Sequence, residues 1–549
     1  MKIALAQLNY HLGNFEKNAE KIIRHIKKAK EDSADLIVFS ELSVCGYSPY
    51  DLLEKSNFID QVYDSVKRIA SVCQGISVII GAPTINESQN GKKLHNSAIF
   101  IKDCEITDTV HKTLLPTYDI FDEYRYFEPN TEFRVIDVNG KKIAITICED
   151  LWDDQPTSNS FAKSKLYITS PIDELEKLNP DIVINIAGSP FSYNQKSLRK
   201  DILVKNAKEH HVPVVYVNQV GAQAELIFDG GSMYVDNEGK IIDELAYFKE
   251  DYRLIDTEFN EVESVQPEQS AIEKIHDALV LGIRDYFLKM NFSKAVIGLS
   301  GGIDSAIVAA LAVEALGKEN VHGLLMPSKY SSGHSVDDAV ALAKNLGIKY
   351  DLINIQSVVD SFEKSLSPLF ENLNPDVTEE NIQARARGIF LMALSNKYRY
   401  ILLNTSNKSE CAVGYGTLYG DMNGGLSVLG DVYKSDCYKL AGYINRDKEV
   451  IPQNTIIKPP SAELRPGQKD SDSLPEYDIL DKILFRYIEL NQSAEDIIRD
   501  GFDEMIVRKA VKLVNINEYK RFQAPPILRV SSKAFGFGRR IPLVAKFDI

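Results

Sequence analysis

The 549-residue sequence lacks the marks of several large classes of protein. Its six cysteines form no C-x-x-C pair and have no regular spacing, which argues against a disulfide framework or a structural zinc site. No uninterrupted apolar run approaches the ~20 residues of a membrane-spanning helix. The first residues, MKIALAQLNYHLGN, lack the long apolar core of a signal peptide and predict a strand instead. We therefore expect a reduced, cytoplasmic protein with no membrane partner.

The sequence also lacks an excess of basic residues. It has 63 Lys and Arg against 78 Asp and Glu, a net charge of -15, whereas a general nucleic-acid binder has the opposite balance. We therefore expect no nucleic-acid partner. The charge is uneven, because residues 1–270 hold 29 basic and 43 acidic residues whereas residues 271–549 hold 34 and 35. From Lys520 to Ile549 there are seven basic residues and one Asp.

The change in charge coincides with a polar stretch, TEFNEVESVQPEQS, that has no apolar periodicity. We predict two large domains, residues 1–257 and 271–549, joined by a linker at 258–270. Both parts alternate short apolar runs such as DLIVFSE, KIAITICED and DIVINIAGSP with helix-like stretches such as FEKNAEKIIRHIKKAKED. The fold class expected for both parts is therefore α/β.

A glycine-rich turn is the sharpest local feature of the second part. The apolar run AVIGL leads into Ser300-Gly301-Gly302 and then into the helix-like SAIVAALAVEAL. Backbone N–H groups at such a turn make an anion site, and Asp304 could cap the helix or hold Mg²⁺ beside phosphates. A plain strand–helix turn remains an alternative. No G-x-x-x-x-G-K-[ST] string occurs, so a P-loop kinase or GTPase is excluded.

The loop Ser300–Ser305 resembles that of the N-type ATP pyrophosphatases, which cleave ATP between its α- and β-phosphates. Downstream strings such as EENIQARARGIFLMALSNK and LLNTSNKSECAVGYGTLYGDMNGG extend the resemblance to the NAD synthetases over most of residues 271–549. The resemblance implies a doubly wound parallel sheet with ATP at Gly298, Ser300, Gly301, Gly302, Asp304, Ser305, Thr405 and Lys434. It implies Mg²⁺ at Asp304 and Glu410, and deamido-NAD at Asn381, Arg385, Glu410, Asp421 and Lys520. For any one of these charged residues a surface salt bridge remains open, and Arg385 and Arg387 cannot share a helix face.

Three reactive residues follow apolar runs in the first part. Glu41 ends DLIVFSE, Lys112 lies in VHKTLLPTY, and Cys148 ends KIAITIC. A lone cysteine is more often an inert core residue. The three residues in this order, with the strings ELSVCGYSPYDLL, HKTLLPTY and ICEDLW, resemble the nitrilase superfamily of carbon–nitrogen hydrolases over residues 1 to about 255. That resemblance implies an α-β-β-α sandwich and a Glu–Lys–Cys catalytic triad.

The chemistry of amide hydrolysis gives each residue a role. Glu41 would deprotonate Cys148 and protonate the departing ammonia, and Lys112 would stabilise the oxyanion and lower the pKa of the cysteine. Glu128 could hold Lys112 in place, although a surface role fits it nearly as well. The resemblance implies glutamine contacts at Tyr118, Ser189 and Lys196, of which the last two also fit an ordinary loop. Trp152, the single tryptophan, is expected to pack beside the cysteine.

Together the two parts resemble the glutamine-dependent NAD synthetases. The resemblance implies glutamine, ATP and deamido-NAD as substrates, Mg²⁺ with the ATP, internal passage of ammonia, and a homo-oligomer. Four alternatives stay open on the residues alone. They are another glutamine-fed adenylating amidotransferase, a tRNA-modifying transferase with the same loop, a chain with one degenerate half, and a simple nitrilase with an unrelated ATP module.

Overall fold

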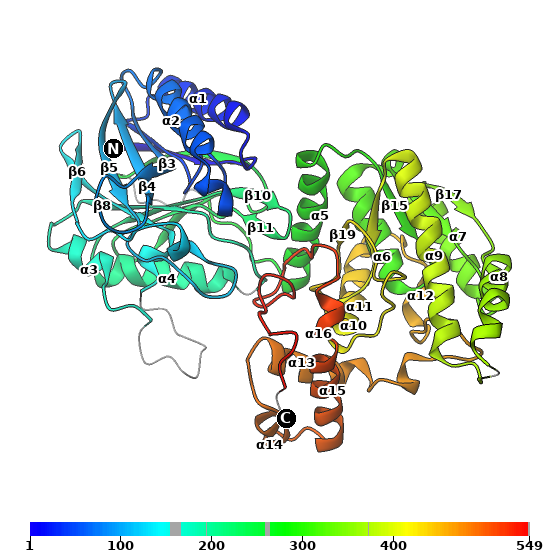
Figure 1. Cartoon of the computed structure of the whole chain (residues 1–549). Helices are drawn as coiled ribbons and strands as arrows, with labels where there is room; N and C mark the ends of the chain where they lie inside the picture. Colours follow the sequence, from blue (N-terminus) through cyan, green and yellow to red (C-terminus); the bar gives the residue numbers. More distant parts are fainter. Residues whose placement is uncertain (154–165, 194, 259–263, 372, 547–549) are drawn as a thin grey trace. The chain divides into compact units, whose positions relative to one another are not determined.

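The computed structural model of the chain consists of two compact units, Met1–Glu268 and Gln269–Ile549, drawn in Figure 1. The structure describes residues 1–153, 166–193, 195–258, 264–371 and 373–546. Part of the expected linker, residues 259–263, therefore lies outside the described residues. Over the described ranges, no helix combines the length and apolar character needed to cross a membrane.

The first unit contains two mixed six-stranded sheets. One sheet has the order β14-β1-β2-β3-β4-β5, with β1, β2 and β3 parallel and the other neighbours antiparallel. Its strands are β1 (Lys2–Gln7), β2 (Leu36–Val38), β3 (Ser77–Ile85), β4 (Leu94–Lys102), β5 (Glu105–His111) and β14 (Asp251–Asp256). Residues from both ends of the unit thus lie in one sheet, because β14 pairs with β1.

The second sheet has the order β13-β12-β9-β8-β7-β6, with β7, β8 and β9 parallel. Its strands are β6 (Val135–Val138), β7 (Lys141–Ile147), β8 (Ile182–Ala187), β9 (Val214–Asn218), β12 (Met233–Val235) and β13 (Ile241–Glu244). A separate hairpin consists of β10 (Val220–Gln223) and β11 (Leu226–Asp229). β7 and β8 are buried along most of their length, as expected for strands covered on both faces.

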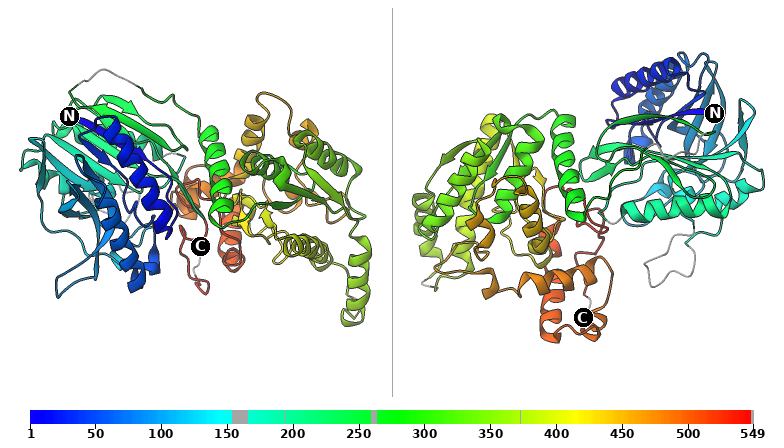
Figure 2. Two further views of the ribbon diagram at one scale, coloured as in Figure 1. Left: turned by 90° about the horizontal axis from the view of Figure 1, so that it is seen from above. Right: turned by 180° about the vertical axis from the view of Figure 1, so that it is seen from behind.

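Helices cover the outer face of each sheet, so the first unit has four layers (Figure 2). Successive side chains of a strand point to opposite faces. Ile3 and Leu5 of β1 accordingly join the core that contains the second sheet, whereas Ala4 and Ala6 pack with residues of α1 (Phe15–Glu31) and α2 (Ser56–Ala70). α3 (Pro171–Glu176) and α4 (Gln195–Glu209) lie on the other side, against the second sheet. The predicted α-β-β-α sandwich is confirmed.

The second unit is built on an all-parallel sheet with the order β17-β16-β15-β18-β19. Its strands are β15 (Ala295–Gly298), β16 (Val321–Leu325), β17 (Lys349–Leu352), β18 (Ile401–Asn404) and β19 (Leu426–Ser427). The surrounding helices are α5 (Ala271–Lys289), α6 (Ile303–Leu316), α7 (Gly333–Leu346), α8 (Gln356–Leu366), α9 (Val377–Tyr398), α10 (Lys408–Val413) and α11 (Lys434–Ile444). The strand order reverses between β15 and β18, and ligands of such sheets bind beyond the carboxyl ends of the strands at that point. The predicted doubly wound sheet is confirmed.

A second, helical core completes this unit. It is formed by α10, α13 (Tyr477–Ile488), α14 (Ala494–Arg499) and α15 (Glu504–Ile516), which bury residues such as Leu480, Val511 and Phe535 together. The remaining short helices are α12 (Gln453–Ile457) and α16 (Glu518–Arg521). α10 follows β18 and packs in the helical core, and its N-cap Asn407 and its residue Glu410 are described below.

Candidate active sites

The glycine-rich loop follows β15 at the edge where the strand order reverses. The Ser300 hydroxyl accepts a hydrogen bond from the Gly302 N–H (3.1 Å) and lies 3.1 Å from the Ser305 hydroxyl. Gly301 has φ +80, and a Cβ at this position would lie 2.1 Å from the Ser335 carbonyl oxygen. The glycine is therefore required both by its backbone conformation and by the approach of α7. These contacts fix the loop, and its N–H groups lie at the start of α6, where a helix can bind an anion.

A cavity of about 290 Å³ opens beside this loop. Its lining includes nine of the residues predicted for ATP, metal or deamido-NAD, namely Gly298, Ser300, Gly302, Asp304, Ser305, Thr405, Glu410, Asp421 and Lys434. The cavity is also lined by Arg387, Lys458, Glu463 and Asp470, which sequence reasoning did not assign to it. Loops after three parallel strands, β15, β16 and β18, contribute to its wall. The cavity thus lies where a doubly wound sheet binds its ligands.

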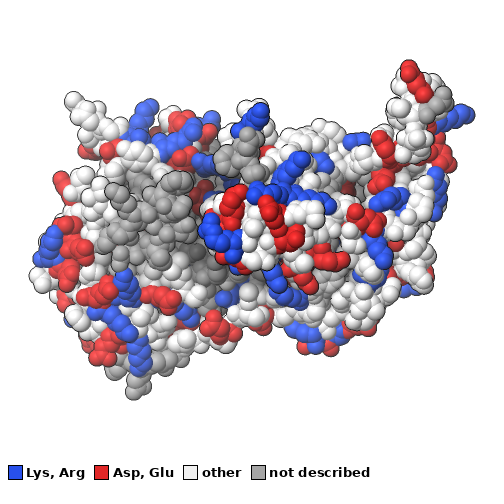
Figure 3. All heavy atoms as spheres, turned by 90° about the horizontal axis from the view of Figure 1, so that it is seen from below, with Lys and Arg blue, Asp and Glu red and all other residues white. Residues whose placement is uncertain are grey.

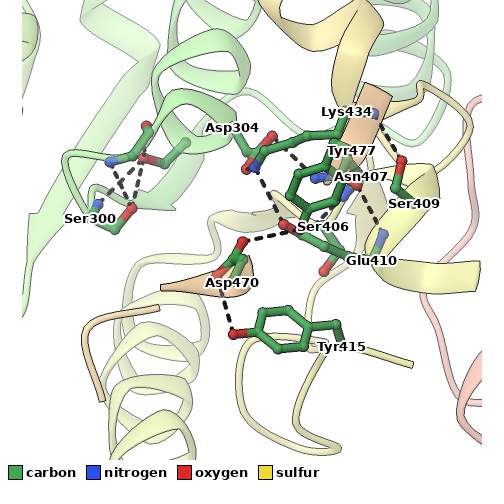
Figure 4. Close-up of polar contacts among 12 residues, drawn as sticks. Ser300, Asp304, Ser406, Asn407, Ser409, Glu410, Tyr415, Lys434, Asp470 and Tyr477 are labelled. Atoms are coloured by element: carbon green, nitrogen blue, oxygen red, sulfur yellow. Dashed lines mark hydrogen bonds and ion pairs between the residues drawn. The ribbon is translucent and has the colours of Figure 1, made fainter. Parts of the chain in front are cut away.

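Asp304, Lys434 and Glu410 form a charged cluster on one side of the cavity (Figure 4). The Lys434 ammonium lies 2.5 Å from a carboxylate oxygen of Asp304 and 3.5 Å from one of Glu410. Burial opposes the charge on Lys434, but the two carboxylates outweigh it and hold its pKa well above the usual value. Burial raises the pKa of Glu410 to about 8, against the attraction of Lys434. In this cluster Lys434 therefore stays protonated, and Glu410 keeps its proton to a higher pH than an ordinary glutamate.

Asn407 connects this cluster to the start of α10. Its side-chain amide donates to Asp304 (3.3 Å), and its side-chain oxygen caps α10 by accepting from the Glu410 N–H (3.0 Å). The Glu410 carboxylate accepts from the Asn407 N–H in return, which is a reciprocal capping box. The string Asn407-Lys-Ser-Glu410 carries that N-x-x-E signal, although the sequence did not indicate that it would orient a functional acid.

Asp470 is a buried acid that sequence reasoning missed. It accepts hydrogen bonds from Tyr415 (3.1 Å) and Tyr477 (3.0 Å), as Figure 4 shows. Burial raises its pKa, with Lys434 acting in the opposite direction. Asp470 is 4% exposed and lines the cavity. It lies in a polar segment without periodicity, so no sequence signal marked it.

The other residues predicted for deamido-NAD gather around the loop 414–421. Thr417 donates its hydroxyl to the side-chain oxygen of Asn381 (2.7 Å) and its N–H to the Asp421 carboxylate (2.5 Å). The Arg385 guanidinium donates to the Leu418 carbonyl oxygen (3.2 Å), and the Lys520 ammonium donates to two carbonyl oxygens of the same loop. Of these residues only Asp421 lines the cavity. Arg385 is exposed, whereas Arg387, on another face of α9, lines the cavity.

In the first unit, the three predicted catalytic residues lie just beyond the ends of strands. Glu41, Lys112 and Cys148 follow β2, β5 and β7 and are all buried. The Lys112 ammonium donates to Glu41 at 2.8 Å. Burial and the charge of Glu41 raise the pKa of the Cys148 thiol well above its ordinary value, although Lys112 opposes them. Lys112 thus acts to lower the pKa of Cys148, as predicted, but burial and Glu41 outweigh it, and the thiol needs a base to be ionised.

Glu123, not Glu128, is the second acid that holds Lys112. The Lys112 ammonium lies 2.8 Å from one Glu123 oxygen and donates to the other at 2.9 Å, and Tyr47 donates to the same carboxylate at 2.7 Å. The Glu128 carboxylate instead accepts from the Lys92 N–H. Both acids lie in the string DEYRYFE, and only the single turn Glu123–Arg125 decides which of them faces inward.

The turn that bears Cys148 is held by its neighbours. Cys148 has φ +45, a conformation that non-glycine residues rarely adopt. The Asp150 carboxylate accepts from the Ile147 N–H and from the N–H groups of Thr113 and Leu114, which follow Lys112. One buried carboxylate thus ties the cysteine turn to the lysine segment. Trp152 is buried in the same core cluster as Cys148, which confirms the packing expected for it.

The residues predicted to contact glutamine have different surroundings. The Tyr118 hydroxyl donates to Glu149, the residue after Cys148, at 2.8 Å, and Tyr167 donates to the same carboxylate at 2.9 Å. Burial raises the pKa of Glu149 to about 7. Ser189 is buried after β8, where its N–H donates to Asn218 at 2.9 Å. Lys196 lies at the start of α4, and its side chain is outside the part of the chain that the structure describes.

Comparison with known proteins now defines the class. A carbon-nitrogen hydrolase family model matches residues 2–266, and an NAD synthase family model matches residues 275–524. The chain therefore joins an amide-hydrolysing domain to an ATP-using synthase domain. It is 46% identical to the glutamine-dependent NAD(+) synthetase of Synechocystis sp. over 99% of both chains, and 40% identical to that of Thermotoga maritima over 100% of this chain and 99% of that one. The chain belongs to the family of glutamine-dependent NAD(+) synthetases, which are ATP-dependent ligases.

A solved structure agrees with this assignment. The glutamine-dependent NAD+ synthetase of Acinetobacter baumannii, in complex with adenosine diphosphate, is 40% identical and superposes with a TM-score of 0.78. The match covers 99% of this chain and 98% of that one. One solved chain thus matches this chain over nearly its whole length.

Proposed function

We propose that the two sites act in sequence, the first releasing ammonia from glutamine and the second using it to amidate deamido-NAD at the expense of ATP. The observation that carries this proposal is the presence on one chain of a buried Glu–Lys pair beside a cysteine and of an Asp–Lys–Glu cluster beside a phosphate-type loop. The products are NAD, AMP, pyrophosphate and glutamate. ADP in the Acinetobacter baumannii relative supports a nucleotide in the second site.

At the first site, Glu41 takes the proton of the Cys148 thiol, and the thiolate attacks the amide carbon of glutamine. The buried, protonated Lys112 stabilises the oxyanion, since its pKa stays well above the ordinary value. Glu41 then gives the proton to the leaving nitrogen and activates the water that hydrolyses the thioester. We propose that Tyr118, Ser189 and Lys196 bind the glutamine. Tyr118 bonds to Glu149, the residue after Cys148, and Ser189 follows β8.

At the second site, the N–H groups of the loop Ser300–Ser305 bind ATP phosphates with Thr405 and Lys434. The nicotinate carboxylate of deamido-NAD attacks the α-phosphate, pyrophosphate leaves, and ammonia displaces AMP from the acyl adenylate. Lys434 offsets the developing negative charge, because it is held charged inside the cavity. We propose that Asn381, Arg385, Asp421 and Lys520 position deamido-NAD around the loop 414–421.

The donor set beside the loop fits Mg²⁺. Asp304 and Glu410 supply carboxylate oxygens, the hard ligands that this ion prefers, on one side of the cavity. Bound there with ATP, the ion would neutralise phosphate charge and polarise the α-phosphate. We further propose a cytoplasmic enzyme that acts as a homo-oligomer.

The test supplies ATP, Mg²⁺, deamido-NAD and either glutamine or ammonium, and follows NAD, AMP and pyrophosphate. We expect one AMP for each NAD, since adenylation precedes amidation. Cys148→Ala should abolish synthesis from glutamine and keep synthesis from ammonium, whereas Asp304→Ala should abolish both. NAD formation without AMP would contradict the proposed chemistry, and loss of the ammonium reaction in Cys148→Ala would make Cys148 a structural residue.

A further inference from the structure

We propose that Asn96 is a positioning residue of the glutaminase site, which fixes the Glu41 carboxylate so that one defined oxygen exchanges protons with Cys148. This inference rests on the proposed role of Glu41 as the base. Asn96 lies on β4 and is 1% exposed. Its side-chain amide donates to Glu41 Oε1 at 2.7 Å. A carboxylate can only accept, so the amide N–H₂ must be the group that faces it.

The hydrogen bonds of Glu41 distinguish its two oxygens. Oε1 accepts from Asn96 Nδ2 and from Lys112 Nζ (2.8 Å), and the two donors use both of its lone pairs. Oε2 accepts one hydrogen bond among the described residues, from the Gly188 N–H at 2.8 Å. One lone pair of Oε2 therefore remains for the proton of the Cys148 thiol. If Asn96 were absent, Oε1 would also have an unused lone pair, and the carboxylate could turn.

The backbone of Asn96 acts on the second catalytic residue. The Asn96 carbonyl oxygen accepts from the Lys112 N–H at 2.8 Å. This bond continues the antiparallel pairing of β4 with β5, in which Ser97 lies opposite His111. One residue thus fixes the carboxylate of Glu41 with its side chain and the main chain of Lys112 with its carbonyl group.

Burial of the Asn96 side chain is unfavourable in one respect. Its side-chain oxygen is buried without a hydrogen-bond partner among the described residues. Buried polar atoms are nearly always paired, and an unpaired one is unfavourable. Among the residues that the structure describes, the one hydrogen bond of this side chain is that to Glu41. We infer that this buried amide is retained for its single hydrogen bond to the catalytic acid, although its side-chain oxygen gains no partner there.

The experiment compares Asn96→Ala and the isosteric Asn96→Asp with the wild-type full-length enzyme. Loss of a hydrogen bond to a charged group should lower the glutaminase kcat about 10- to 100-fold. The KM for glutamine should change by less than about threefold, since Asn96 acts through Glu41. The acidic limb of the pH profile should move to higher pH in Asn96→Ala, because the ionised Glu41 has lost a donor.

Two controls separate positioning from folding. NAD synthesis from ammonium occurs at the other site and should be unchanged in every variant. Asn18→Ala removes a comparably buried amide, whose hydrogen bonds among the described residues all go to the backbone of His11 and Val44. It should lower thermal stability but not move the pH profile. If Asn96→Ala does not fold, the glutaminase kcat and pH profile of Asn96→Asp, which has nearly the same side-chain volume, test the inference.

Three results would overturn the inference. They are a wild-type kcat and pH profile in both Asn96 variants, a loss of ammonium-dependent synthesis that parallels the loss with glutamine, and an equal shift of the pH profile in Asn18→Ala. A wild-type chain that does not hydrolyse glutamine would instead contradict the proposed function itself.

Discussion

Lys112 and Lys434 are each buried between two carboxylates, one lysine at each site. Lys112 contacts Glu41 and Glu123, and Lys434 contacts Asp304 and Glu410. Burial alone would drive a lysine to lose its proton, but two nearby negative charges reverse the effect and raise the pKa of both. A lysine that stays charged in a site of low polarity stabilises a developing anion more strongly than one in water.

The first prediction concerns the second acid on Lys112. Glu123→Gln should destabilise the first unit by on the order of 3 kcal/mol, because it removes one partner of a buried charge. It should also lower glutamine hydrolysis at least about tenfold, since Lys112 is then held by Glu41 alone. Thermal unfolding and a glutaminase assay measure the two effects.

Glu128→Gln is the matched control, five residues further along the same segment. The Glu128 carboxylate accepts a hydrogen bond from the Lys92 N–H, and the side-chain oxygen of Gln can accept the same bond. The free energy of unfolding should therefore change by less than about 0.5 kcal/mol. Equal effects of the two substitutions would show that Lys112 does not depend on Glu123.

At the scale of elements, the turn between β15 and α6 depends on Gly301. Gly301→Ala places a methyl group against the Ser335 carbonyl oxygen in a backbone conformation that costs alanine about 1 to 2 kcal/mol. We expect ATP-dependent synthesis to fall by more than about tenfold while glutamine hydrolysis persists. Gly333→Ala at the start of α7, where nothing lies within 4 Å of the added Cβ, should keep both activities. Normal synthesis in Gly301→Ala would mean that the turn can adjust.

The packing of three helices predicts a pH dependence of stability. His276 on α5 bonds to Asp277 and to Glu314 on α6, and its ring packs against Tyr443 of α11. Burial opposes the charge, but the two carboxylates raise the pKa of His276 to about 9. A raised pKa means that the folded state binds the proton more tightly than the unfolded state. The stabilisation is therefore complete below the ordinary value of 6.5 and is lost as the pH rises to about 9.

His276→Asn should accordingly lower the thermal midpoint most at about pH 6 and progressively less up to about pH 9. Thermal unfolding of both proteins across this pH range measures the difference between their midpoints. Groups that titrate equally in the two proteins do not contribute to that difference. A difference that does not vary with pH would show that His276 contributes packing and not charge.

For the molecule as a whole, each unit has its own cores and its own candidate site. Cys148→Ala and Asp304→Ala therefore inactivate different steps, and a mixture of the two proteins contains every active site. If ammonia passes within the enzyme, the mixture should make little NAD from glutamine when an ammonia-consuming enzyme is present, whereas the wild type should continue. NAD formation by the mixture at the wild-type rate would show that ammonia is released to solution.

The division of charge also belongs to this scale. The basic C-terminal stretch is not a free cationic surface, because Arg521 and Arg539 both pair with Glu518. Lys520 is bonded to backbone carbonyl groups of the loop 414–421. On the face drawn in Figure 3, acidic and basic side chains are interspersed. Three of the seven basic residues from Lys520 to Ile549 thus bond to groups of the second unit itself.

Local chemistry made much of both units predictable from the sequence. Apolar β-branched runs predict β7, β8 and β15, since such residues suit strands buried on both faces. Gly301 and Gly302 predict the phosphate-type turn, because only a few sequences allow that backbone. Glu41, Lys112 and Cys148 each follow a recognisable strand, and the carboxyl ends of strands open into clefts. Their order and the strings around them resemble the nitrilase superfamily, and that resemblance implied the triad.

Tertiary structure alone decided which polar residues outside these patterns reach the sites. Glu123 or Glu128, and Arg387 or Arg385, are equivalent in sequence, and a single turn or helix face separates them. Asn96 lies 55 residues from Glu41, and Asp470 lies 55 residues from Tyr415, so no local spacing connects them. The pKa of Cys148 likewise depends on burial and on the charges of four residues, Glu41, Lys112, Glu123 and Glu149. The sequence determines each strand, turn and reactive side chain locally, whereas the partners and charge states of those side chains depend on distances that only the folded chain sets.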